Sequence, residues 1–221
     1  MTQLLFHCKT IVLFDMGNET DSSTRWKNIL DRDILKGSIN MVALFVMLYE
    51  LLEDTVISRP KDFYSVIEFD EKAQKEYQER VLSLYDKEVC PGISSKNKEI
   101  ISSLIWFKRN GAIDDSDIEI FSNSRTLRNK VTHEMLYTIA DGGELLAVPF
   151  AMMYGLFCKI EKWWILEVEI PTSAELAPEE IDQDGVISGH MLILDTILDI
   201  LANNSNIHFK EACEQLGIPV N

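Results

Sequence analysis

Residues 41–57, MVALFVMLYELLEDTVI, decide the fold class because apolar side chains cover most sides of the helix that they would form. The run is shorter than the ~18–20 apolar residues that a bilayer-spanning helix needs, and acidic residues interrupt it. A helix that is apolar on most sides is normally buried. We therefore expect a buried helix over about residues 34–57, which ends near Pro60 because proline cannot donate the next helical hydrogen bond.

Most of the remaining chain also has the patterns of helices. Glycine is scarce, and the alternation that is typical of strands is nearly absent after the first fifteen residues. Further helices are predicted at about 70–88, 95–110, 114–141, 144–168, 190–204 and 208–217. The predicted fold is all-α: an antiparallel four- to five-helix bundle with additional C-terminal helices.

The predicted organisation follows from these helices and from one loop. The loop covers 171–187 and is acidic, with two prolines and few apolar residues. We expect an N-terminal segment over 1–30 that packs on the bundle, the bundle itself over 31–170, and a helical extension over 188–221.

Composition limits the classes of function. The 221 residues include 36 acidic and 21 basic side chains, a net charge of −15, which argues against non-specific binding to nucleic acid or to anionic membranes. The four cysteines are far apart in the sequence, which suits neither a zinc site nor a disulfide framework and indicates reduced thiols. The N-terminus lacks the pattern of a signal peptide. We expect a cytoplasmic protein with no metal or other cofactor and no membrane partner.

The candidate site lies in residues 122–143, SNSRTLRNKVTHEMLYTIADGG. If this stretch is one helix that Gly142–Gly143 ends, residues four apart share a face. A polar stripe then contains Arg125, Asn129, His133 and Tyr137, with Arg128 and Thr132 on the next ridge. The apolar residues would face the core: Leu127, Val131 and Met135, together with Leu136 and Ile139. A histidine on a polar helix face is, however, most often a surface residue.

The hexapeptide RNKVTH, Arg128 to His133, resembles the RNxxxH motif of the HEPN superfamily, which carries it on a late helix of a helical bundle. The order of the predicted helices over about 30–170 is similar to that family. Many HEPN proteins are metal-independent endoribonucleases of toxin–antitoxin or anti-phage systems, in which two chains place their motif helices across one cleft. The resemblance implies a homodimer with Arg128 and His133 as the reacting pair, Asn129 as an orienting residue, and RNA as substrate.

Other residues near the motif acquire candidate roles. Arg125 and Lys130 would add positive charge for substrate phosphate, and Tyr137 would stack on a base or donate a hydrogen bond, or else lie at the edge of the core. Lys108 and Arg109 could join this basic region.

The chain departs from some toxin members in one position, because Met135 stands where they have a tyrosine that a partner enzyme modifies. The acidity of the chain leaves open a second reading, a non-catalytic HEPN-like bundle that binds a protein or nucleotide partner. A subunit of a larger defence complex, or a partner of an antitoxin, is a further alternative.

Three acidic residues, Glu50, Glu53 and Asp54, lie in the first predicted helix. We interpret them as the solvated end of that helix. The alternative is that one of them pairs with Arg128 or Arg125 and holds it in place.

Overall fold

The computed structural model describes residues 20–64, 84–91, 96–173, 182 and 185–202. All of the regular secondary structure in these ranges is helical, so the protein is all-α. The predicted helix at 208–217, most of the predicted helix at 70–88 and most of the loop at 171–187 lie outside the described residues.

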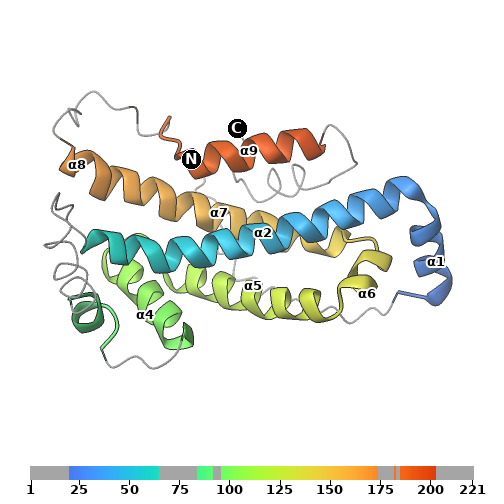
Figure 1. The fold of residues 1–221 in the computed structure, drawn as a ribbon, viewed down its shortest axis with the longest axis horizontal. Helices are drawn as coiled ribbons and strands as arrows, with labels where there is room; N and C mark the ends of the chain where they lie inside the picture. The colour runs from blue at the N-terminus through green and yellow to red at the C-terminus, as the bar shows by residue number, and fades with distance from the viewer. Residues whose placement is uncertain (1–19, 65–83, 92–95, 174–181, 183–184, 203–221) are drawn as a thin grey trace, which may run out of the picture.

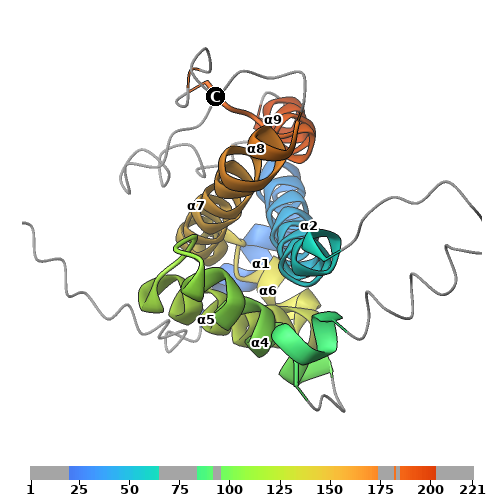
Figure 2. The ribbon, with the colours of Figure 1, turned by 90° about the vertical axis from the view of Figure 1, so that its left-hand side faces the viewer.

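The long helices lie side by side in a bundle-like arrangement (Figures 1 and 2). In chain order they are α2 (Arg32–Phe63), α4 (Lys96–Arg109), α5 (Asp115–His133), α7 (Ala147–Trp164) and α9 (Gly189–Ala202). Helix α2 contacts α4, α5 and α7, while α5 runs in the opposite direction to α2 and α7.

Short elements connect or extend these helices. They are α1 (Ser22–Leu30), α6 (Met135–Ala140), a 3₁₀ turn η1 (Glu144–Leu146), a π-helical turn η2 (Ile165–Glu169) and α8 (Ile170–Thr172). Helices α1 and α6 contact each other and α2 at one end of the arrangement. The described part of the predicted N-terminal segment, residues 20–30, thus packs on α2 through α1.

Helix α2 supplies the centre of the core. Its buried side chains include those of Phe45, Leu48 and Leu52, which are fully buried. They pack with apolar residues of α4, α5 and α7, among them Phe107, Phe121, Phe150 and Phe157. Within the described residues, α2 is also the one helix long and apolar enough to cross a membrane by length and composition, a test that core helices also pass.

Helix α2 does not end before Pro60, as the sequence predicts, but continues to Phe63. Proline removes one helical hydrogen bond and its ring crowds the preceding turn. Here only three residues follow Pro60 in the helix, and its ring is buried in the structure. The packing of this last turn therefore outweighs the lost hydrogen bond.

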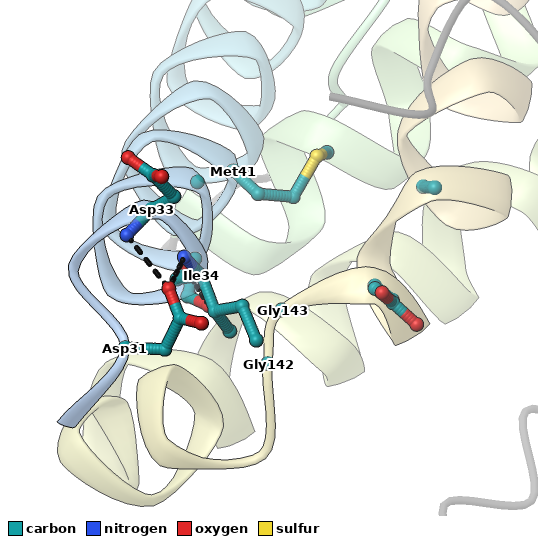
Figure 3. Close-up of a pocket in the computed structure, with 10 residues that line it drawn as sticks. Asp31, Asp33, Ile34, Met41, Gly142 and Gly143 are labelled. Atoms are coloured by element: carbon teal, nitrogen blue, oxygen red, sulfur yellow. Dashed lines mark hydrogen bonds between the residues drawn. The ribbon is translucent and has the colours of Figure 1, made fainter. Parts of the chain in front are cut away.

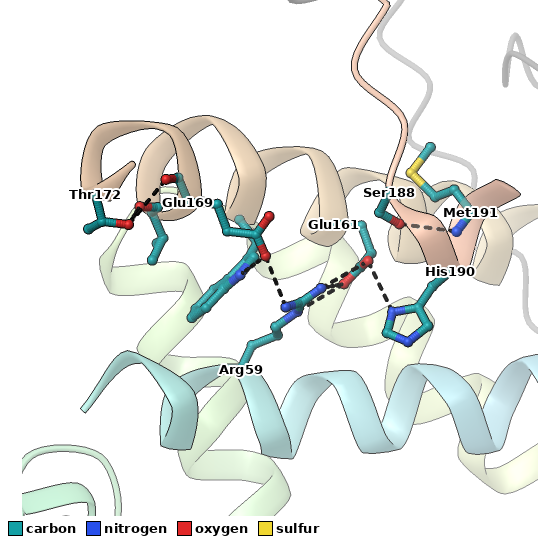
Figure 4. A network of polar contacts seen from close by, with 9 residues as sticks. Arg59, Glu161, Glu169, Thr172, Ser188, His190 and Met191 are labelled. Atoms are coloured by element: carbon teal, nitrogen blue, oxygen red, sulfur yellow. Dashed lines mark hydrogen bonds and ion pairs between the residues drawn. The ribbon is translucent and has the colours of Figure 1, made fainter. Parts of the chain in front are cut away.

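A polar network joins the C-terminal end of α2 to α7 and α9 (Figure 4). The Arg59 guanidinium donates to both carboxylate oxygens of Glu161, at 2.9 and 3.1 Å from Nη2. Glu161 is fully buried, and the Nδ1 atom of His190 on α9 lies 3.4 Å from its Oε2 atom. Arg59 also contacts Glu169 in η2 and lies over the Trp164 ring. The network thus ties α9 to the main helices.

Candidate functional site

Helix α5 begins at a capping box that fixes its position. The Asp114 carboxylate accepts hydrogen bonds from the backbone N–H groups of Ser116 (2.8 Å) and Asp117 (3.1 Å), while Asp117 Oδ2 accepts one from the Asp114 N–H (2.9 Å). Lys159 of α7 forms an ion pair with Asp117 and reaches Asp114 at 3.5 Å. The Ser116 hydroxyl is the main cause that lowers the pKa of Asp114 to about 2.

The apolar face of α5 fixes which side chains point outward. Phe121, Leu127 and Val131 are buried in the core, as the spacing predicts for the last two. Asn129, Lys130 and His133 are exposed, and Arg125 and Arg128 are partly buried. Asn129, Lys130 and His133 therefore lie on the side of α5 that faces away from the core, whereas Arg128 lies at the boundary with α2.

The prediction of one continuous helix through residues 122–141 is wrong after His133. Helix α5 stops at His133, and Glu134 has the non-helical angles φ −116° and ψ 29°. A second helix, α6, then starts at Met135. Met135 is 40% exposed and Leu136 82% exposed, so neither belongs to the core as predicted. Tyr137 is on α6, outside the stripe of Arg125, Asn129 and His133.

Contacts with α1 explain the new direction of the chain. Arg25 forms an ion pair with Asp141 at 2.6 Å and lies over the Tyr137 ring, 5.6 Å from its centroid. Asn28 donates a hydrogen bond to the Ala140 carbonyl at 2.9 Å. The motif region has no proline or glycine before Gly142, so local sequence carries no signal of this break. Tyr137 is 63% exposed, which leaves its ring accessible beside Arg25.

Arg128 has the most contacts among the motif side chains. Its Nη2 atom forms an ion pair with Glu50 of α2, and its Nη1 atom donates to Asn129 Oδ1 at 3.2 Å. The guanidinium lies 5.4 Å from the centroid of the Tyr49 ring, a cation–π contact. The predicted alternative, in which an acid of α2 pairs with Arg128, is therefore confirmed for Glu50.

Two buried residues of α2, Tyr49 and Glu53, lie on the core side of Arg128. Glu53 is 7% exposed, so the expectation that all three acids of this region are solvated is wrong for it. The Tyr49 hydroxyl donates to Glu53 Oε2 at 2.7 Å. Burial and then Glu53 raise the pKa of Tyr49, although Arg125 and Arg128 oppose the shift. Sequence reasoning missed this pair, which the spacing of a phenol and a carboxylate four residues apart on a helix could have indicated.

The cations near the motif differ in their pairing. Within the described residues, no carboxylate is within ion-pair distance of Arg125 or Lys130. Lys108, by contrast, pairs with Asp115 at the first residue of α5. That residue is about 27 Å along the helix from His133. Lys108 is therefore engaged at the opposite end of α5 from His133.

Arg128 and His133 do not meet within one chain. They are five positions apart, which puts their side chains about 140° apart around the helix axis. No hydrogen bond or ion pair joins them in the described part of the chain. His133 is exposed at the C-terminal end of α5, where its side chain is accessible to a ligand or a partner.

A separate pocket of about 340 Å³ lies at the start of α2 (Figure 3). Its lining includes Asp31, Asp33 and Glu144 together with Gly142 and Gly143. The Asp31 carboxylate already accepts hydrogen bonds from the backbone N–H groups of Asp33 (3.0 Å) and Ile34 (3.2 Å). Two of the free N–H groups of this helix start are thus capped, and the acidic lining does not suit a phosphate.

In the described ranges, no group of three or more His, Cys, Asp or Glu side chains is arranged to hold a metal ion. Neither a family model, nor a curated protein, nor a solved structure matches this chain. The candidate site consequently depends on the motif and on the geometry of α5.

Proposed function

We propose that the protein is a HEPN-like, metal-independent endoribonuclease that cleaves RNA by attack of the 2′-hydroxyl group. The observation that carries the proposal is the motif RNKVTH on α5, with His133 exposed and Arg128 held by Glu50, Asn129 and Tyr49. The all-α fold is consistent with it.

The side chains fit the chemistry of this reaction. A histidine exchanges protons near neutral pH, and an arginine binds two phosphate oxygens with its planar fork. Arg128 is about a third exposed, so its guanidinium can reach a phosphate on the outside. The Glu50 side chain is 47% exposed, and an exposed ion pair is worth only about 0–1 kcal/mol, so a phosphate can compete with Glu50. Arg125 and Lys130 supply further charge.

The reaction needs both a base and an acid. Among the described residues, His133 is the one histidine on this side of α5, because His190 lies on α9 beside Glu161. We therefore propose a homodimer in which the two copies of His133 share one cleft. A cytoplasmic role in toxin–antitoxin or anti-phage defence, with an antitoxin or defence protein as partner, belongs to the same proposal.

The experiment compares the purified protein with His133→Ala and Arg128→Ala on a mixture of labelled RNAs with EDTA present. Both variants are expected to lose cleavage by about 10²–10⁴-fold, the usual contribution of general acid–base catalysis, while far-ultraviolet circular dichroism stays unchanged. Glu119→Gln, an exposed change elsewhere on α5, is the matched control. Cleavage that persists in His133→Ala, or that is absent from the wild type, contradicts the proposal.

One observation favours the second candidate, a non-catalytic bundle that binds a protein or nucleotide partner. Arg128 already has an anionic partner in Glu50, so its charge is partly neutralised before any ligand arrives. If the wild type binds RNA or a partner protein without cleaving RNA, and Arg128→Ala abolishes that binding, this second candidate is favoured.

A further inference from the structure

Tyr49 is the most buried of the residues that contact the Arg128 guanidinium. It is 1% exposed, and its hydroxyl donates to Glu53 Oε2 at 2.7 Å on the next turn of α2. Its ring also packs against Phe121 of α5, with 5.9 Å between ring centroids. The ring is thus held at its edge by a hydrogen bond and on one side by an aromatic contact.

The Arg128 guanidinium packs against the face of the Tyr49 ring. The guanidinium carbon is 5.4 Å from the ring centroid, while Glu50 and Asn129 bind the two terminal nitrogens. The Arg128 Nε atom is buried without a hydrogen-bond partner in the described structure, so the inner edge of the guanidinium faces protein and not solvent. Each terminal nitrogen carries a second N–H group that the bonds to Glu50 and Asn129 do not use.

Glu50 and Tyr49 are neighbours in sequence but differ in how firmly they are held. Glu50 is on the surface and half-exposed, so its carboxylate can move when a phosphate arrives. Tyr49 cannot move without breaking its contacts with Glu53 and Phe121. When a phosphate displaces Glu50, the ring is the contact from α2 that still keeps Arg128 in its orientation.

We propose that Tyr49, anchored by the buried carboxylate of Glu53, is a positioning residue that holds the Arg128 guanidinium toward the substrate phosphate. The inference rests on the proposed ribonuclease function. A long, partly exposed arginine otherwise samples many rotamers, and each one that points away from the phosphate is unproductive. A ring face beneath the guanidinium removes those rotamers before the substrate binds.

The test replaces Tyr49 by leucine, which removes the ring face, and by phenylalanine, which retains it. Tyr49→Leu is expected to lower kcat for RNA cleavage by roughly 10–100-fold, with KM changed by less than about twofold, because misplacing a reacting group by about 1 Å can cost that much. Tyr49→Phe should stay within about fivefold of wild-type kcat because the ring remains.

A spectroscopic measurement keeps the test independent of catalysis. In the wild-type protein, the ring of Tyr49 should shift the side-chain proton resonances of Arg128 upfield relative to those of Arg109, an exposed arginine on α4. Tyr49→Leu should abolish that shift and raise the mobility of the Arg128 Nε–H group. The Arg128 resonances are assigned as those that disappear from the spectrum of the Arg128→Lys variant.

The two proposals fail in different ways. A wild-type protein that does not cleave RNA rejects the ribonuclease function, whereas the resonances still report whether Tyr49 orders Arg128. Arg128 resonances in the wild type that match those of Arg109 overturn the positioning role, even if Tyr49→Leu fails to fold. A folded Tyr49→Leu variant with wild-type kcat overturns it as well.

Discussion

Replacing Arg59 by methionine should destabilise the protein strongly, because it leaves a fully buried carboxylate without its main partner. Arg59 donates three hydrogen bonds to Glu161, from Nε to Oε1 at 3.1 Å and from Nη2 to Oε1 at 2.9 Å and Oε2 at 3.1 Å. The Glu161 side chain is 0% exposed and that of Arg59 is 16% exposed, so water replaces little of this interaction. Methionine keeps a long apolar side chain, so the substitution mainly removes the positive charge and the hydrogen-bond donors of Arg59.

The magnitude follows from the burial. Removing one partner of a buried ion pair typically costs about 3–5 kcal/mol, and we expect Arg59→Met to fall in that range. Glu161→Leu should cost less, because Arg59 is nearer the surface and keeps Glu169 at 3.3 Å. The double variant should cost less than the sum of the two by roughly 2–4 kcal/mol, since an apolar replacement of both partners leaves no buried charge.

The assay is urea denaturation followed by far-ultraviolet circular dichroism for the wild type, both single variants and the double variant. Arg109→Met on the exposed side of α4 serves as the control and should change the free energy of unfolding by less than about 0.5 kcal/mol. The reasoning fails if Arg59→Met costs less than about 1 kcal/mol or if the two single losses simply add.

Four further substitutions test the capping box, two glycine positions and the core. Asp114→Asn keeps the helix cap but removes a carboxyl whose folded pKa of about 2 lies below its unfolded value of about 3.9. The stability that the charge contributes is therefore present above about pH 4 and lost as the pH falls to about 2, so the thermal midpoints of the wild type and Asp114→Asn should converge over that range. Gly143→Ala and Gly111→Ala both place alanine at a positive φ, but only at Gly143 would the new Cβ lie 3.0 Å from the Ser38 Cα atom. Gly111→Ala should cost about 1–2 kcal/mol in urea denaturation and Gly143→Ala more, so equal losses would contradict the close approach. Phe157→Ala, at a fully buried position, should cost about 3–5 kcal/mol in the same assay, and a loss below 1 kcal/mol would mean that the site is not packed as described.

Local patterns were sufficient for much of the fold. The apolar periodicity of α2 and α7, the acidic start of α5 and the glycines after α6 are all readable in a single sequence. Each depends on interactions between residues a few positions apart, such as the capping box at Asp114. Pro149 shows the same, because it lies in the first turn of α7, where its missing N–H group costs no hydrogen bond.

The failed prediction of one continuous helix through the motif concerns residues whose partners are distant in sequence. The break at Glu134 depends on Arg25 and Asn28, which bind Asp141 and the Ala140 carbonyl more than a hundred positions away. No residue next to the break is a helix breaker. The break moved Tyr137 out of the stripe and exposed Leu136.

For the candidate site, the sequence by itself determined the outward face that carries Arg125, Asn129 and His133, because helical spacing and an apolar opposite face are local properties. Only the tertiary structure decided what surrounds Arg128. Glu50 and Tyr49 come from α2, about eighty positions earlier, and contact Arg128 because α2 and α5 pack side by side. A periodic pattern specifies which side of a helix is buried, whereas the partner across the interface depends on how two helices are placed in space.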